Sequence, residues 1–74
     1  MTQLDLKSEM TGVICKILVA VGDTVAEDDT LVVVESMKME IPIVAPKAGR
    51  VVAIRGGEGD PISEGDSPVT LAVD

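Results

Sequence analysis

The sequence has no Phe, Tyr, Trp or His, and it has a single Cys among 74 residues. Without aromatic side chains there is no surface on which nucleic-acid bases could stack, and the formal net charge of −7 repels a phosphate backbone. Without histidine the chain lacks the base of a Ser-His-Asp or Cys-His catalytic centre. The composition therefore argues against nucleic-acid binding and against the commonest forms of nucleophilic catalysis.

Disulfides and membrane spans are also missing from the sequence. Cys15 has no partner for an internal disulfide, which is typical of proteins in a reducing compartment. No apolar run approaches the roughly 20 residues that a membrane-spanning helix needs. Hydrophobic residues make up 46% of the chain, enough for one small core. We therefore expect a single cytoplasmic domain over residues 1–74 that binds no membrane.

The second half of the chain repeats the first at an offset of 37 residues, so that residues 11–36 align with residues 48–73 without a gap. Seven aligned pairs are identical: Gly12/Gly49, Ile17/Ile54, Gly22/Gly59, Asp23/Asp60, Glu27/Glu64, Asp29/Asp66 and Val32/Val69. A 37-residue unit is too short to bury a core alone. We expect the halves to share one core about a pseudo-twofold axis.

Each half is rich in β-branched residues, which favour strands. Gly, Asp or Pro interrupts these runs every eight to twelve residues, and no helical periodicity extends over three turns. The expected strands are Gln3–Leu6, Gly12–Val19, Thr24–Ala26, Leu31–Ser36, Met39–Val44, Gly49–Arg55, Pro61–Ser63 and Val69–Val73. Adjacent apolar residues at Ile14 and Cys15 indicate a bulge or a strand shared between sheets. The pattern predicts an all-β flattened barrel or sandwich of about eight short strands.

Two of these strands flank only Met37-Lys38, so a two-residue β-hairpin is the natural connection. Its register pairs residues whose numbers sum to 75: Ser36/Met39, Glu35/Glu40, Val34/Ile41, Val33/Pro42 and Val32/Ile43. This register places the side chains of Val32, Val34, Ile41 and Ile43 on one apolar face. It also places Pro42 at a non-hydrogen-bonded position, where its missing N–H faces away from the partner strand.

The apex of this hairpin breaks two local rules. Tight hairpin turns favour Asn-Gly or Asp-Gly, because one or both central residues need a positive φ angle. Met37 and Lys38 would be strained there by about 1–3 kcal/mol. Glu35 opposite Glu40 adds repulsion between like charges. Such departures tend to mark functional sites. In this turn the Lys38 amine would lie at the outermost point of the hairpin, beside two adaptable methionines. A lysine in a turn is more often only a solvated charge.

The segment Glu-Ser-Met-Lys-Met-Glu, residues 35–40, resembles the biotinylation motif of the biotinyl/lipoyl attachment domains. Ala45-Pro46 and Gly49 downstream, and Gly22-Asp23 and Val25 upstream, stand at the spacing of this family. The resemblance implies a barrel-sandwich of two four-stranded antiparallel sheets with pseudo-twofold symmetry. The first half has no inserted "thumb", so the chain resembles the thumbless type of biotin carboxyl carrier protein.

The resemblance also implies a function in which the chain itself is not an enzyme. A biotin protein ligase would attach biotin covalently to Lys38, with Met37 and Met39 beside the cofactor and Glu35, Ser36 and Glu40 in recognition. Carboxybiotin would then move between the biotin carboxylase and carboxyltransferase sites of a biotin-dependent carboxylase. The chain would supply no catalytic residue, and the Asp and Glu spacings of residues 23–29 and 58–66 match no calcium loop.

Two alternatives remain open on the sequence. Lipoyl domains typically carry Asp-Lys-Ala in place of Met-Lys-Met, so a lipoyl or dual biotin/lipoyl attachment protein is the nearest alternative. The other is a structural or adaptor β-domain in which Lys38 is unmodified. The acceptor substrate of any partner carboxylase cannot be read from these residues.

Overall fold

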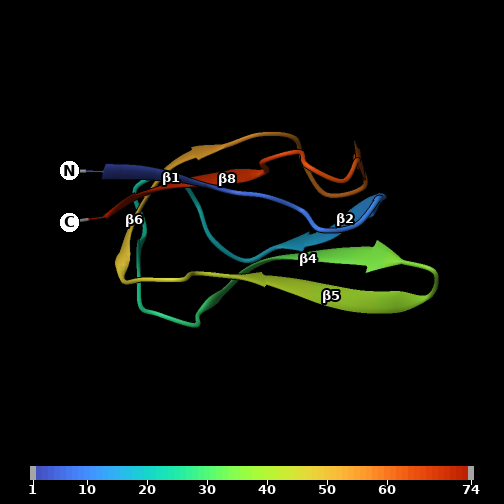
Figure 1. The fold of residues 1–74 in the computed structure, drawn as a ribbon, viewed down its shortest axis with the longest axis horizontal. Helices are drawn as coiled ribbons and strands as arrows, with labels where there is room; N and C mark the ends of the chain where they lie inside the picture. The colour runs from blue at the N-terminus through green and yellow to red at the C-terminus, as the bar shows by residue number, and fades with distance from the viewer. Residues whose placement is uncertain (1, 74) are drawn as a thin grey trace.

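The computed structural model describes residues 2–73, which form eight strands and no helix (Figure 1). The strands are β1 (Thr2–Leu6), β2 (Gly12–Ile17), β3 (Thr24–Val25), β4 (Thr30–Ser36), β5 (Met39–Val44), β6 (Gly49–Ile54), β7 (Pro61–Ile62) and β8 (Val69–Val73). All eight expected strands are present. β5 and β8 have the expected bounds, and β1 and β4 begin one residue earlier than expected. β2, β3, β6 and β7 end one or two residues earlier, because a turn begins there before the expected strand ends.

The strands form two four-stranded antiparallel sheets, which confirms the predicted fold class. The order is β1-β8-β6-β3 in one sheet, here sheet A, and β5-β4-β2-β7 in the other, sheet B. An offset of 37 residues converts one order into the other, since β1 corresponds to β5, β2 to β6, β3 to β7 and β4 to β8. The two sheets therefore have the pseudo-twofold relationship expected from the repeat.

The core lies between the sheets and is aliphatic throughout. Its largest fully buried side chains are Leu31, Leu71, Val32, Val34, Val51 and Val69. The five hairpin pairs from Ser36/Met39 to Val32/Ile43 have the predicted register. Val32 and Val34 are buried, and Ile41 and Ile43 are half-buried beside them, so the predicted apolar face is confirmed.

Bulges explain the irregular apolar pattern of the second strand. The register of β2 against β4 shifts between Ile14 and Lys16, so Cys15 is the inserted residue. The register of β6 against β8 shifts between Val51 and Ala53, at the equivalent residue Val52. Of the two explanations that the sequence left open, the bulge is correct, and it occurs once in each half.

The domain is elongated, with Cα extents of 35 × 18 × 17 Å. The β4–β5 hairpin forms one end of the long axis, and the chain termini lie at the opposite end (Figure 1). Only residues 18–23 connect β2 to β3, so no thumb is inserted there. Within residues 2–73 no helix is long and apolar enough to cross a membrane.

Candidate functional site

The turn between β4 and β5 has positive φ angles at both central residues, 52° at Met37 and 67° at Lys38. This is the backbone of a type I′ turn, whose twist matches that of the two strands. Neither residue is Gly or Asn, so the backbone of each occupies a left-handed conformation that its Cβ atom disfavours. The strain expected from the sequence is therefore present, and the rest of the hairpin must hold it.

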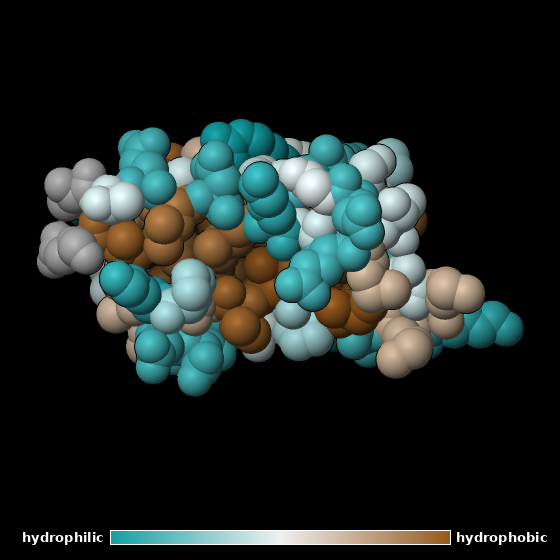
Figure 2. Space-filling model, in the orientation of Figure 1, coloured by the Kyte–Doolittle hydropathy of each residue, from teal (hydrophilic) through white to brown (hydrophobic). Residues whose placement is uncertain are grey.

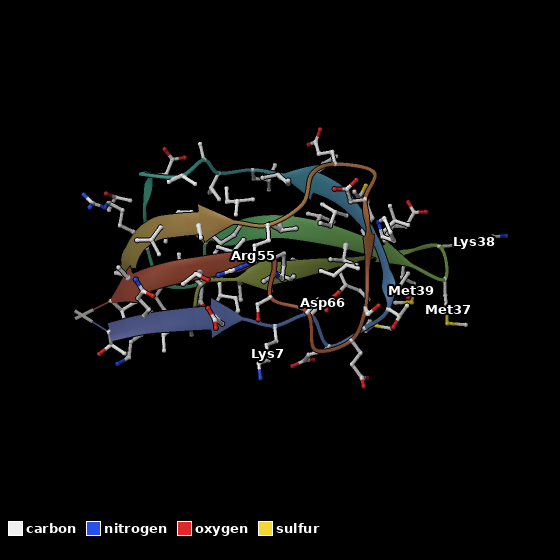
Figure 3. All side chains as sticks on the ribbon, turned by 90° about the horizontal axis from the view of Figure 1, so that it is seen from above. Lys7, Met37, Lys38, Met39, Arg55 and Asp66 are labelled. Atoms are coloured by element: carbon white, nitrogen blue, oxygen red, sulfur yellow. The ribbon has the colours of Figure 1, made fainter. Side chains whose placement is uncertain are left out.

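The side chains at this turn point away from the domain. Met37 is 88% exposed and Met39 is 65% exposed, which excludes the core or rim position that methionines near a strand end usually take. Lys38 is exposed, and its amine extends from the end of the hairpin beyond the rest of the protein (Figure 3). An amine so placed can enter the active site of another protein without any rearrangement of the strands.

Two carboxylates stand just behind the turn. Glu35 pairs with Glu40 across β4 and β5, as predicted, and both side chains are exposed. Cys15 lies 3.7 Å from Glu40, measured from Sγ to Oε2. Partial burial, followed by the negative charge of Glu40, raises the pKa of the Cys15 thiol. The thiol is therefore protonated beside the acidic pair and poorly suited to act as a nucleophile.

Ser36 is the one motif residue whose side chain is buried. It is only 7% exposed, and its hydroxyl donates a 2.8 Å hydrogen bond to the carbonyl oxygen of Thr11. The bond ties the end of β4 to the segment that leads into β2. The recognition role of Ser36 stays a prediction, and the structure gives its hydroxyl a contact that holds the base of the hairpin.

Gly12 also supports the hairpin, and sequence reasoning missed this role. A Cβ atom at Gly12 would lie 2.2 Å from the carbonyl oxygen of Glu35, so only glycine permits this approach of β2 to β4. A Cβ atom at the equivalent Gly49 would likewise lie 2.5 Å from the carbonyl oxygen of Ala72. The identity of these two glycines in the repeat was the available sign of a close backbone contact.

The site is a protrusion and not a pocket. A groove of about 480 Å³ opens between the edge strands β1 and β5, lined by Leu6, Met10, Ile41, Ile43 and Pro46 among others, and Lys38 is not part of it. Apolar surface between the two sheets is visible in Figure 2. Across residues 2–73 no cluster of three or more Cys, Asp or Glu side chains could hold a metal ion.

A family model described as "Biotin-requiring enzyme" matches residues 3–71. The chain is 46% identical over 67 residues to the biotin carboxyl carrier protein of Streptococcus mutans serotype c, covering 90% of this chain and 52% of that protein. It is 43% identical over 64 residues to the biotin/lipoyl attachment protein of Bacillus subtilis, covering 86% and 88%. The chain thus spans about half the length of the Streptococcus protein.

A solved carboxylase structure contains the same fold. The urea carboxylase of Kluyveromyces lactis contains a region that superposes with a TM-score of 0.90 and 35% sequence identity, covering 97% of this chain and 6% of that one. The matching region is thus a small part of a large carboxylase. The sequence match over residues 3–71 and the shared fold agree. The chain belongs to the family of biotinyl/lipoyl attachment domains, the biotin-requiring enzyme family.

Proposed function

We propose that Lys38 carries covalently attached biotin and that the chain is a biotin carboxyl carrier. The observation that carries the proposal is the strained type I′ turn, which holds an exposed lysine amine at the end of the long axis between Met37 and Met39. In this proposal the chain is a carrier and not itself an enzyme, which its similarity to a biotin carboxyl carrier protein supports.

The residues present fit the chemistry of attachment. The Lys38 nitrogen attacks the activated carboxyl carbon of biotin, an amide bond forms, and the activating group leaves with the nitrogen losing a proton. A lysine amine is largely protonated near neutral pH, so the ligase must provide the base and the positioning. The amide removes one positive charge, so the formal net charge of −7 becomes −8.

Once bound, biotin would accept a carboxyl group at one active site and release it at another. The β4–β5 hairpin would keep the attachment point clear of the rest of the domain. Tethering would raise the local concentration of the carboxyl group at each active site. The partners in this proposal are a biotin protein ligase, a biotin carboxylase and a carboxyltransferase. A cytoplasmic location, without membrane or nucleic-acid binding, is part of the same proposal and is supported by the unpaired Cys15 and the acidic charge.

A lipoyl or dual biotin/lipoyl attachment protein is the second candidate. The 43% identity to the Bacillus subtilis biotin/lipoyl attachment protein supports it, whereas Met37 and Met39 favour biotin alone. Blotting the native protein with streptavidin and, in parallel, with an antibody to lipoate separates the candidates. A signal with the antibody alone contradicts biotin attachment.

Intact-mass measurement after co-expression with a biotin protein ligase tests the main proposal. We expect one biotinyl increment on the wild-type chain and none on Lys38→Arg, which keeps the charge and the fold. The matched control is Lys47→Arg, a second exposed lysine placed just beyond β5, which should retain the increment. An unmodified wild-type chain, or an increment that persists in Lys38→Arg, overturns the proposal.

A further inference from the structure

The two halves of the chain allow an internal comparison of the outer faces of the two sheets. Corresponding residues differ by 37 in number and occupy equivalent backbone positions. Leu18 N, for example, donates to Leu31 O at 2.9 Å, and its counterpart Arg55 N donates to Pro68 O at 2.8 Å. A difference in side chain between equivalent positions is therefore not required by the fold.

The outer face of sheet A carries a polar chain of three side chains. Arg55 Nη1 donates to Thr70 Oγ1 at 2.7 Å, and Thr70 Oγ1 donates to Asp5 Oδ1, also at 2.7 Å. Arg55 Nη1 further donates to Ser67 O at 3.3 Å. The arginine thus lies over the sheet (Figure 3), and Thr70 beneath it is only 3% exposed. This face is closed by its own charged side chains.

The equivalent positions on sheet B are all apolar. Leu18, Val33 and Pro42 take the places of Arg55, Thr70 and Asp5, and the register of sheet B pairs Val33 with Pro42. Leu18 is 55% exposed. Two further outward residues follow the same rule, since Val13 replaces Arg50 and Val44 replaces Lys7, and they are 43% and 40% exposed. These five residues, 13, 18, 33, 42 and 44, are here called the sheet B patch.

Exposed apolar residues grouped on one face of a small protein are typical of an interaction surface. Sheet A shows that the same backbone folds with polar residues at these positions, so the patch has no structural necessity. Its position relates it to the hairpin. Pro42 is four residues from Lys38, about 14 Å along the strand, and an interface of about 800 Å² per partner is roughly 30 Å across. A partner interface that begins at Lys38 and extends along sheet B therefore covers Pro42 and reaches Leu18, which is hydrogen-bonded to Leu31, seven residues or about 24 Å from Lys38.

The charges at the hairpin end of the patch specify the partner further. Glu35 and Glu40 lie nearer the turn than Val33 and Pro42 do, in one row with Val13, and Lys16 lies within the patch, opposite Val33. An apolar partner surface bordered by Arg or Lys on the side nearest its active site complements this arrangement. Such a surface would bury the patch and pair with the two carboxylates.

We infer that the sheet B patch is the docking surface for the biotin protein ligase that modifies Lys38. This inference rests on the proposed function. The ligase must bring the Lys38 nitrogen itself into its active site, so the protein surface behind the turn has to approach closely. At a carboxylase the long biotinyl-lysine arm bridges the distance, and the domain can remain farther away. Docking on the patch thus explains apolar residues next to a turn that itself offers few contacts.

A matched pair of substitutions tests the inference in biotinylation kinetics with the full chain, biotin, ATP and the ligase of its own organism. Leu18→Arg places a charge on the patch. Val21→Arg makes the same change three residues away, at a residue that is 61% exposed and beside the Gly22 N to Val51 O contact with sheet A. We expect Leu18→Arg to lower kcat/KM at least about tenfold through KM, and Val21→Arg to remain within about twofold of wild type.

The triple variant Leu18→Arg/Val33→Thr/Pro42→Asp distinguishes loss of docking from loss of the fold. It copies onto sheet B the three residues that sheet A already holds together, and it leaves the net charge unchanged. We expect a cooperative thermal unfolding transition together with a kcat/KM reduced at least as far as in Leu18→Arg. A folded triple variant modified at the wild-type rate overturns the inference, as does equal behaviour of Leu18→Arg and Val21→Arg.

Self-association through the patch is the competing outcome. Sedimentation equilibrium of the wild type and of Leu18→Arg distinguishes it: a wild-type dimer that dissociates in the variant, with unchanged ligase kinetics, would assign the patch to a second copy of the chain. Failure of the proposed function looks different, because the wild type then receives no biotin at all.

Discussion

Asp28 and Gly65 occupy equivalent positions in the two halves, and both have a left-handed backbone, with φ of 71° and 91°. Their amides make equivalent hydrogen bonds: Asp28 N donates to Ala45 O at 2.7 Å, and Gly65 N donates to Ser8 O at 2.9 Å. The same turn is thus built twice, once with a residue that accepts this conformation without strain and once with a residue that does not.

Replacing Asp28 with Gly should therefore stabilise the domain by about 0.5–1 kcal/mol, because relief of the backbone strain exceeds the added entropy of the unfolded chain. Urea denaturation measures the change. Asp28→Ala is the control, since it removes the same charge but keeps a Cβ atom, and it should be about 1 kcal/mol less stable than Asp28→Gly. An alanine variant as stable as the glycine variant would contradict strain at this turn.

Relief of backbone strain should also stabilise the turn at Met37 and Lys38, but there it should cost the proposed function. Met37→Asn/Lys38→Gly supplies the residues that a type I′ turn prefers and should raise stability by about 1–2 kcal/mol. For a domain of this size the melting temperature should rise by about 4–8 °C per kcal/mol. Under the proposed function, biotin attachment should be lost at the same time. Lys38→Arg, which also prevents attachment, should leave the melting temperature near that of the wild type, so an equal rise in both variants would show that turn strain is not the cause.

Most of the fold could be predicted from the sequence because its determinants are local or repeated. Val32 and Val34 face the core through simple alternation, and the two-residue spacing between Ser36 and Met39 permits one hairpin register. The repeat then extends the arrangement of one half to the other. Lys38 could be proposed as the attachment residue from local sequence as well, since the resemblance to the biotinylation motif rests on the contiguous residues 35–40.

The parts that could not be predicted depend on contacts between distant residues. No local pattern predicts the hydrogen bond from the buried Ser36 hydroxyl to the carbonyl oxygen of Thr11, which is 25 residues away in the sequence. The hydrogen bonds from Arg55 through Thr70 to Asp5 join residues 50 positions apart, and no local sequence pattern predicts them. The apolar character of the sheet B patch becomes meaningful only beside these polar residues, and this comparison needs both sheets.

The reactivity of the Cys15 thiol should report the negative charge of Glu40 behind the turn. Because burial and Glu40 raise the thiol pKa, less thiolate is present at a given pH, and alkylation by iodoacetamide at pH 8 should be slower than for an unhindered thiol. Glu40→Gln removes one cause, lowers the pKa and should accelerate the reaction. Glu27→Gln makes the same charge change in the β3–β4 turn and should have no effect, so equal acceleration in both variants would assign the shift to net charge.

The close contact at Gly12 provides the most direct test of how the hairpin is held. A methyl group there would meet the Glu35 carbonyl at 2.2 Å and the Ser36 Cβ at 3.2 Å, and neither belongs to a flexible side-chain end that could move aside. Gly12→Ala should therefore push β2 away from β4 and cost about 1–3 kcal/mol of stability.

Gly57→Ala is the matched control for Gly12→Ala, because the nearest atom to its new Cβ is Asp60 Oδ2 at 3.8 Å, an ordinary contact. We expect that variant to stay within about 0.5 kcal/mol of wild type in urea denaturation. Displacement of β4 at Glu35 also loosens the strand that carries the turn. Amide hydrogen exchange should consequently accelerate from Ser36 to Met39 in Gly12→Ala and remain unchanged in Gly57→Ala. Wild-type exchange and stability in Gly12→Ala would mean that the backbone absorbs the methyl group and that the attachment turn does not depend on this contact.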